Sequence, residues 1–144
     1  MAIIQTLTTS FKVEVAQALH NFTMGTGDVF KLALYTANAD LGASTTAYTA
    51  SGEVSSSGTN YSTGGIALTN ITPAFQGTTS YWSFQTATFS NVTLTTNGAL
   101  IYNSTNGNRS VAVLNFGVNI TKAGQDLVIT FPANDATNAV LRIA

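Results

Sequence analysis

The sequence lacks cysteine altogether, which excludes disulfide bridges and thiolate metal ligands. It also has little charge, because Asp, Glu, Lys and Arg make up 8% of the 144 residues, against about 25% in an ordinary soluble domain. The few Lys and Arg residues are scattered, and the net charge is −1. A nucleic-acid-binding protein needs clustered positive charge to displace counterions from phosphates, so we expect no nucleic-acid partner.

Long apolar runs are missing too. No run approaches the roughly 18 residues of a membrane-spanning helix. The N-terminal stretch MAIIQTLTTS lacks the basic start of a secretory signal. We therefore expect no membrane partner and no secretory signal.

Groups that perform catalysis are scarce. No Gly-x-Ser-x-Gly motif accompanies the single histidine, His20, and we expect it to contact the last carbonyls of a helix or a partner. Most acidic residues fall in predicted loops or at strand ends, where they are commonly solvated or cap turns. Asp126 and Asp135 flank a predicted strand, and a weak calcium site there is the alternative, although EF-hand spacing is lacking. We predict that the protein is not an enzyme and holds no cofactor or metal.

What the sequence does contain is typical of β-structure. Hydrophobic residues make up 44% of the chain, and the polar residues are chiefly Thr, Ser and Asn, which suit strands and turns. Strand-like runs lie at residues 29–36, 66–71, 80–86, 87–94, 99–103, 111–116, 127–131 and 140–143. Turn signals that separate them include Asn97-Gly98, Asn106-Gly107 and Ala123-Gly124. We predict a single all-β domain over residues 1–144, a jelly-roll-like two-sheet sandwich with one short N-terminal helix.

Residues 98–117, GALIYNSTNGNRSVAVLNFG, consist of two apolar runs around a polar centre and predict a β-hairpin. Both runs are apolar at adjacent positions, where a half-solvated strand would alternate. Both faces of the hairpin are therefore expected to be covered. We expect the core to cover one face, and a helix of the same chain or a sister subunit to cover the other.

One segment, residues 8–22, follows a helical period. Its apolar stripe consists of Phe11, Val15, Ala18, Leu19 and Phe22. We predict a helix of about three turns, which is stable only if this stripe packs on the sheet or on a partner. Thr9 or Ser10 is expected to cap its start, and Glu14 and Gln17 are expected to point away from the stripe.

Two segments have no clear place in the sandwich. Residues 37–65 are rich in Ser, Thr and Gly and predict a long loop region, which we expect Tyr48, Val54 and Tyr61 to anchor. Residues 1–9 are either a mobile N-terminal arm or the first strand of the sheet.

The segment TSYWSFQ places Trp82 and Phe84 on one face of a strand and Tyr81 on the other. Trp82 and Phe84 are predicted to be core residues. Tyr81 is available as a surface contact that could stack on a sugar, so a carbohydrate-binding module is the second functional class.

Several of these stretches resemble small virion proteins of tailed bacteriophages. The resemblance is carried by TTSFK, HNF, FKLALYTANADLG, GALIYN, VAVLNFG and the closing LRI, and it spans most of the chain. It implies a structural protein whose closest functional analogue is a capsid decoration, or cement, protein on the outside of the head. The implied partner is the major capsid protein or another virion protein. The resemblance also implies that the capsid shell could cover the second face of the hairpin at residues 98–117. The alternative is a tail, baseplate or fibre module that binds carbohydrate or a receptor.

We expect the contact surface to include N-terminal apolar residues, the helix end and one strand tyrosine. These residues are Ile3, Ile4, Leu7, His20, Phe22 and Tyr81. Unpaired strand edges in so uncharged a protein also favour pairing between copies. We therefore predict a homo-oligomer, either a dimer or a trimer.

Overall fold

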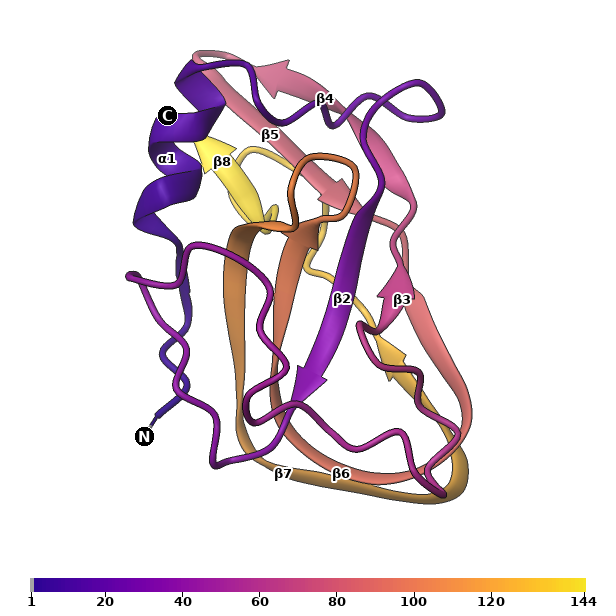
Figure 1. The fold of residues 1–144 in the computed structure, drawn as a ribbon. Helices are drawn as coiled ribbons and strands as arrows, with labels where there is room; N and C mark the ends of the chain where they lie inside the picture. Colours follow the sequence, from indigo (N-terminus) through magenta and orange to yellow (C-terminus); the bar gives the residue numbers. More distant parts are fainter. Residues whose placement is uncertain (1) are drawn as a thin grey trace.

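The computed structural model describes residues 2–144 as two antiparallel sheets and one short helix (Figure 1). The elements are β1 (Thr6–Leu7), α1 (Thr9–Ala16), β2 (Phe30–Tyr35), β3 (Ile66–Ala67), β4 (Asn70–Gln76), β5 (Thr79–Phe84), β6 (Ala87–Asn103), β7 (Arg109–Ile129) and β8 (Leu141–Ile143). The larger sheet has the order β1-β7-β6-β2-β3, and the smaller has the order β4-β5-β8. The predicted mostly β fold with one short N-terminal helix is confirmed, and the two sheets are compatible with a sandwich.

The hairpin of β6 and β7 is the longest feature of the fold. Its turn lies between Asn103 and Arg109, as predicted. The predicted turns at Gly98 and Gly124 are wrong, because both glycines lie inside strands. A β-carbon at Gly98 would lie 2.5 Å from the carbonyl oxygen of Leu114, so close packing requires this glycine. Gly124 has φ +63° at a break in register with β6, and such bulges bend the hairpin, which curves at the bottom of Figure 1.

Both faces of this hairpin are covered within the chain. On one face Ile101 and Val111 belong to the main hydrophobic core, and on the other Leu100 and Val113 belong to a second cluster. The residues that complete the second cluster are Ile3, Ala33, Tyr35, Ala39, Leu41 and Tyr102. The expectation that a helix, a sister subunit or the capsid shell covers this face is wrong, because the N-terminal residues and the start of the 37–65 region cover it.

The helix α1 is shorter than predicted. Its cap is Thr8, whose hydroxyl oxygen accepts a hydrogen bond from the Phe11 amide at 3.4 Å. The predicted caps, Thr9 and Ser10, lie inside the first turn. After the helix ends, Ala18 adopts φ +58° and turns the chain away from the helical path. No helix in residues 2–144 is long and apolar enough to cross a membrane.

The 37–65 region contributes no strand to either sheet, yet its side chains attach it to the fold. Val54 and Tyr61 are buried in the main core, and Tyr48 packs half-buried against the second cluster. At its end Gly65 lies directly against β2, where a β-carbon would overlap the carbonyl group of Leu32. The region is therefore attached to the sandwich at several points, with exposed residues such as 55–58 between them.

The N-terminal segment follows the edge of the larger sheet. β1 pairs antiparallel with β7, with Thr6 opposite Val113 and Leu7 opposite Ala112. Met1, the first residue of the predicted arm, lies outside the described residues.

Candidate functional site

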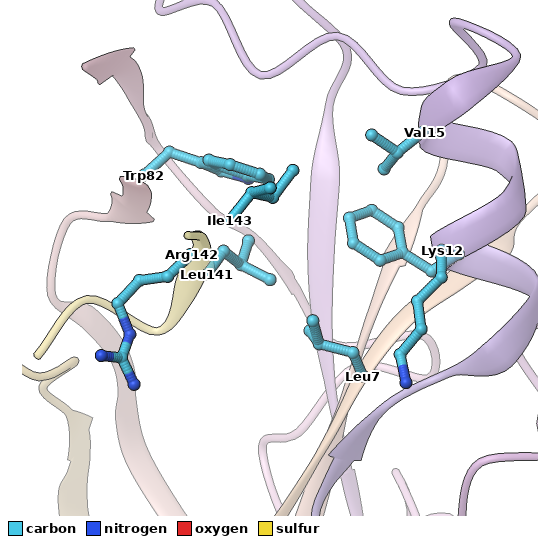
Figure 2. Close-up of a pocket in the computed structure, with 8 residues that line it drawn as sticks. Leu7, Lys12, Val15, Trp82, Leu141, Arg142 and Ile143 are labelled. Atoms are coloured by element: carbon cyan, nitrogen blue, oxygen red, sulfur yellow. The ribbon is translucent and has the colours of Figure 1, made fainter. Parts of the chain in front are cut away.

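One side of the fold is open between α1 and β8, the edge strand of the smaller sheet (Figure 2). A hollow of about 270 Å³ lies there, and most of its lining side chains are apolar. The lining residues are Leu7, Phe11, Lys12, Val15, Trp82, Leu141, Arg142 and Ile143. Two further hollows adjoin it. One of them is also lined by Leu7 and Arg142, and the other is also lined by Val15, Trp82 and Ile143. We call the depression formed by all three the α1–β8 groove.

Local sequence explains which side chains form the walls of the groove. Alternation along β5 turns Trp82 and Phe84 inward, as predicted, and both are buried. Leu141 of β8 pairs with Trp82 and is fully buried, whereas Ile143 is exposed. On the opposite wall, Val15 of α1 faces these residues across the groove (Figure 2).

The charged residues of the groove are cations. Lys12 of α1 and Arg142 of β8 lie on opposite sides of it (Figure 2), and none of the residues that line the three hollows is acidic. Arg142 also donates to the carbonyl oxygen of Thr137. A hydrogen bond from Asn138, two backbone amides and the nearby Arg142 lower the pKa of Asp135, whose carboxylate is engaged in its own turn.

Trp82 brings an unsatisfied donor to the wall of the groove. Its side chain lines two of the hollows, and the residue is only 6% exposed. Its indole N–H has no hydrogen-bond partner within residues 2–144. A buried donor without an acceptor costs about 1–3 kcal/mol.

A buried polar cluster at the end of the groove contains His20. Its Nε2 lies 3.0 Å from Glu14 Oε1, and Arg109 Nη1 donates to Glu14 Oε2 at 2.7 Å. Glu14 is buried, so the prediction that it points away from the packed face of the helix is wrong. Its spacing three residues after Phe11 is the signal that could have placed it on that face.

The other ring nitrogen of His20 faces Asn103. Asn103 Nδ2 lies 3.1 Å from His20 Nδ1 and 2.7 Å from Asp28 Oδ2. The Asn103 side-chain oxygen accepts from two backbone amides of the following turn, so its amide nitrogen is the atom that faces the ring. We therefore assign the ring proton to Nε2, where it is donated to Glu14. The expected contact of His20 with helix carbonyls is wrong, and the ring instead connects α1 to the β6–β7 hairpin.

A second polar cluster surrounds Glu53 in the 37–65 region. Its carboxylate accepts hydrogen bonds from the hydroxyls of Tyr48 and Tyr61, both at 2.6 Å, and from the Gly64 amide at 2.7 Å. The ring of Tyr102 lies tilted against that of Tyr48, and its hydroxyl donates to the carbonyl oxygen of Gly64 at 2.6 Å. These contacts attach the long region to the sheet through tyrosine hydroxyls.

This cluster predicts a loss of stability at alkaline pH. Burial is the largest cause that raises the pKa of the tyrosines in this cluster, which are Tyr35, Tyr48, Tyr61 and Tyr102. The second cause is Glu53, which acts through a hydrogen bond on Tyr48 and Tyr61 and through its negative charge on Tyr35 and Tyr102. A raised pKa in the folded state means that the stabilisation is complete below the unfolded pKa of about 10 and is lost as the pH rises above it. The urea concentration at which half of the protein is unfolded is therefore expected to decrease as the pH is raised above about 10. Tyrosinate absorbance is expected to appear over the same pH range. Because Tyr81 lies outside the cluster, tyrosinate absorbance from more than one of the five tyrosines well before the fold is lost would contradict this.

The acids considered for calcium serve separate local structures. Asp126 Oδ1 accepts from the Asn91 amide at 2.9 Å, and Asp135 Oδ1 accepts from the amides of Thr137 and Asn138 at 2.8 and 2.7 Å. Across residues 2–144, no three His, Cys, Asp or Glu side chains are grouped so as to hold a metal ion.

The structure brings together half of the residues that the sequence suggested as a contact surface. Those that line the α1–β8 groove are Leu7, His20 and Phe22. Of the others, Ile3 is buried in the second cluster, Ile4 is exposed outside the groove, and Tyr81 is half-buried on β5. Sequence reasoning missed Trp82 and the β8 residues as parts of a surface, because their apolar character predicted only core packing.

Comparison with known proteins gives no match, whether to a family model, to a curated protein or to a solved structure.

Proposed function

We propose that this chain is a non-enzymatic structural protein of a tailed-bacteriophage virion, a head decoration protein that binds the outside of the capsid and stabilises it. The resemblance of several stretches to small virion proteins supports the proposal. The observation that carries it is the α1–β8 groove, an apolar depression beside a free strand edge on a chain with few charges. Such a surface suits lasting contact with another protein, because little like-charge repulsion opposes it.

Apolar burial supplies the holding energy in this proposal. At about 25 cal/mol per Å², burial of roughly a few hundred Å² per contact gives several kcal/mol before the costs of association. Repetition of the contact around the shell multiplies its effect. The proposed partner is the major capsid protein or another virion protein, and the proposed fold type is a jelly-roll-like sandwich.

Self-association is part of the proposal. Because β1 pairs with β7 only at Ala112 and Val113, the outer edge of β7 beyond them has no strand partner within residues 2–144. Val118 and Val128 are exposed along that stretch. We expect sedimentation at micromolar concentration to show a dimer or trimer, and a strict monomer would contradict this part of the proposal.

Location in the particle is the direct test of the proposed function. Mass spectrometry of purified virions is expected to detect the chain, and its density is expected on the outer surface of the head. Density on the tail, baseplate or fibres would favour the alternative role, and absence from purified virions would refute both.

Particles that lack the protein provide the functional test. They are expected to release DNA at a lower temperature or under milder osmotic shock than complete particles, while adsorbing normally to cells. Complementation with the intact chain is the control. Unchanged particle stability together with lost adsorption would overturn the decoration role in favour of receptor or carbohydrate binding.

A further inference from the structure

We propose that the α1–β8 groove binds an extended peptide segment of a partner protein, which adds as a strand to the free edge of β8. The segment carries an acidic residue next to alternating apolar ones. This inference deepens the proposed virion role and depends on it only for the origin of the partner.

The strand edge favours a peptide over a small molecule. β8 pairs only with β5, so one row of its N–H and C=O groups faces away from the sheet, on the side where α1 lies (Figure 1). Such groups pair readily with an added strand. The adjoining hollows extend the groove from Ala144 at one end to Pro73 at the other. A row of hollows beside a free edge accommodates alternate side chains of an extended chain.

The charges specify an acidic occupant. Lys12 and Arg142 line the same hollow from opposite sides, and no acid lines the three hollows. Asp135, which lies near Arg142, is held by hydrogen bonds within its own turn. Arg142 has further donors besides the one that binds the carbonyl oxygen of Thr137. Since the guanidinium of Arg142 points away from Lys12 (Figure 2), a carboxylate on the bound segment would pair with one of the two cations, while neighbouring apolar side chains pack on Val15 and Leu141.

The indole of Trp82 provides a probe of the groove. Its ring forms part of the groove wall, and apolar side chains of the bound segment would pack against it. Because Trp82 is the only tryptophan, its fluorescence reports directly on occupancy of the groove.

The test begins with an unbiased library of random peptides selected against the intact protein. We expect the selected peptides to share an acidic residue flanked by alternating apolar residues, and to shift the fluorescence of Trp82 when added as capped synthetic peptides. Methylation of backbone nitrogens along one edge of such a peptide is expected to abolish binding, while methylation along the other edge is tolerated.

Charge variants locate the binding site. The double variant Lys12→Gln and Arg142→Gln is expected to weaken binding at least about tenfold, which corresponds to about 1.4 kcal/mol. Both side chains are exposed, so the urea midpoint serves to show that the variant remains folded. The matched control is Lys122→Gln, which removes a charge from β7 outside the groove and is expected to leave binding unchanged.

Several results would overturn the proposal. They are selection of no peptide, selected peptides without the acidic and apolar pattern, and equal binding of the selected peptides to the double variant. The virion experiments remain independent of these results. Absence of the chain from virions would refute the proposed function while peptide binding could stand, and failed peptide selection would leave a virion role intact.

Discussion

Replacement of Glu14 with alanine is expected to lower the free energy of unfolding by about 2–3 kcal/mol, because the buried imidazole N–H of His20 and the partly exposed guanidinium of Arg109 lose a charged acceptor. The Glu14 side chain is 10% exposed, and both of its carboxylate oxygens are occupied by His20 and Arg109. Alanine leaves the buried imidazole N–H and the guanidinium without their acceptor. Since alanine is the best helix former, the loss cannot come from helix propensity. Urea unfolding followed by the fluorescence of Trp82 measures the effect.

The matched control for this prediction is Asp40→Ala. Asp40 is an exposed acid, so its replacement is expected to change the unfolding free energy by less than about 0.5 kcal/mol. Arg109→Ala is expected to cost less than Glu14→Ala, because the Arg109 side chain is 39% exposed and water can replace part of its contact. A loss below about 1 kcal/mol for Glu14→Ala would show that the pair behaves as a surface salt bridge.

Replacement of Glu53 with alanine is expected to cost about 2–4 kcal/mol, because three donors lose one shared acceptor. Two of these donors are the hydroxyls of Tyr48 and Tyr61, and the third is the Gly64 amide. Residues 37–65 are expected to become sensitive to limited proteolysis, since this carboxylate connects distant parts of the region. Urea unfolding and the time course of proteolysis together measure the effect.

A double-mutant cycle tests the cause of this loss. Glu53→Ala and Tyr48→Phe are expected to be non-additive, because the Tyr48 hydroxyl donates to Glu53. Tyr48 is the appropriate partner because the Tyr61 hydroxyl also accepts from the Leu34 amide, so Tyr61→Phe would break a second bond. Additive losses, or unchanged proteolysis in the Glu53 variant, would show that the cluster does not hold the region.

Local pattern was a sound guide where neighbouring residues decide the structure. The β6–β7 turn, the inward direction of Trp82 and Phe84, and the presence of one short N-terminal helix all follow from the spacing of apolar residues and from turn chemistry. The end of α1 does not, because Ala18 leaves the helix in a left-handed conformation that its sequence does not announce.

The clearest errors of the sequence-based prediction were two turns that it placed at glycines. Asn97-Gly98 and Ala123-Gly124 have the composition of turns, yet both lie within long strands. Gly98 is required by the approach of the Leu114 backbone and of Ile3, and Gly124 by a bulge. A sequence does not distinguish a glycine that reverses the chain from one that lets two distant segments touch.

By itself, the sequence determined that the chain is mostly β, that it has one short N-terminal helix and that its surface carries few charges. Only the tertiary structure decided that Glu14 meets Arg109 across 95 positions, and that the N-terminal residues and the 37–65 region cover the second face of the sheet. It also decided that α1 and β8 border one groove. The physical reason is the separation along the chain of the residues that interact. Turns and periodicities depend on neighbours within a few residues, whereas the order of the strands brings together groups from distant parts of the chain.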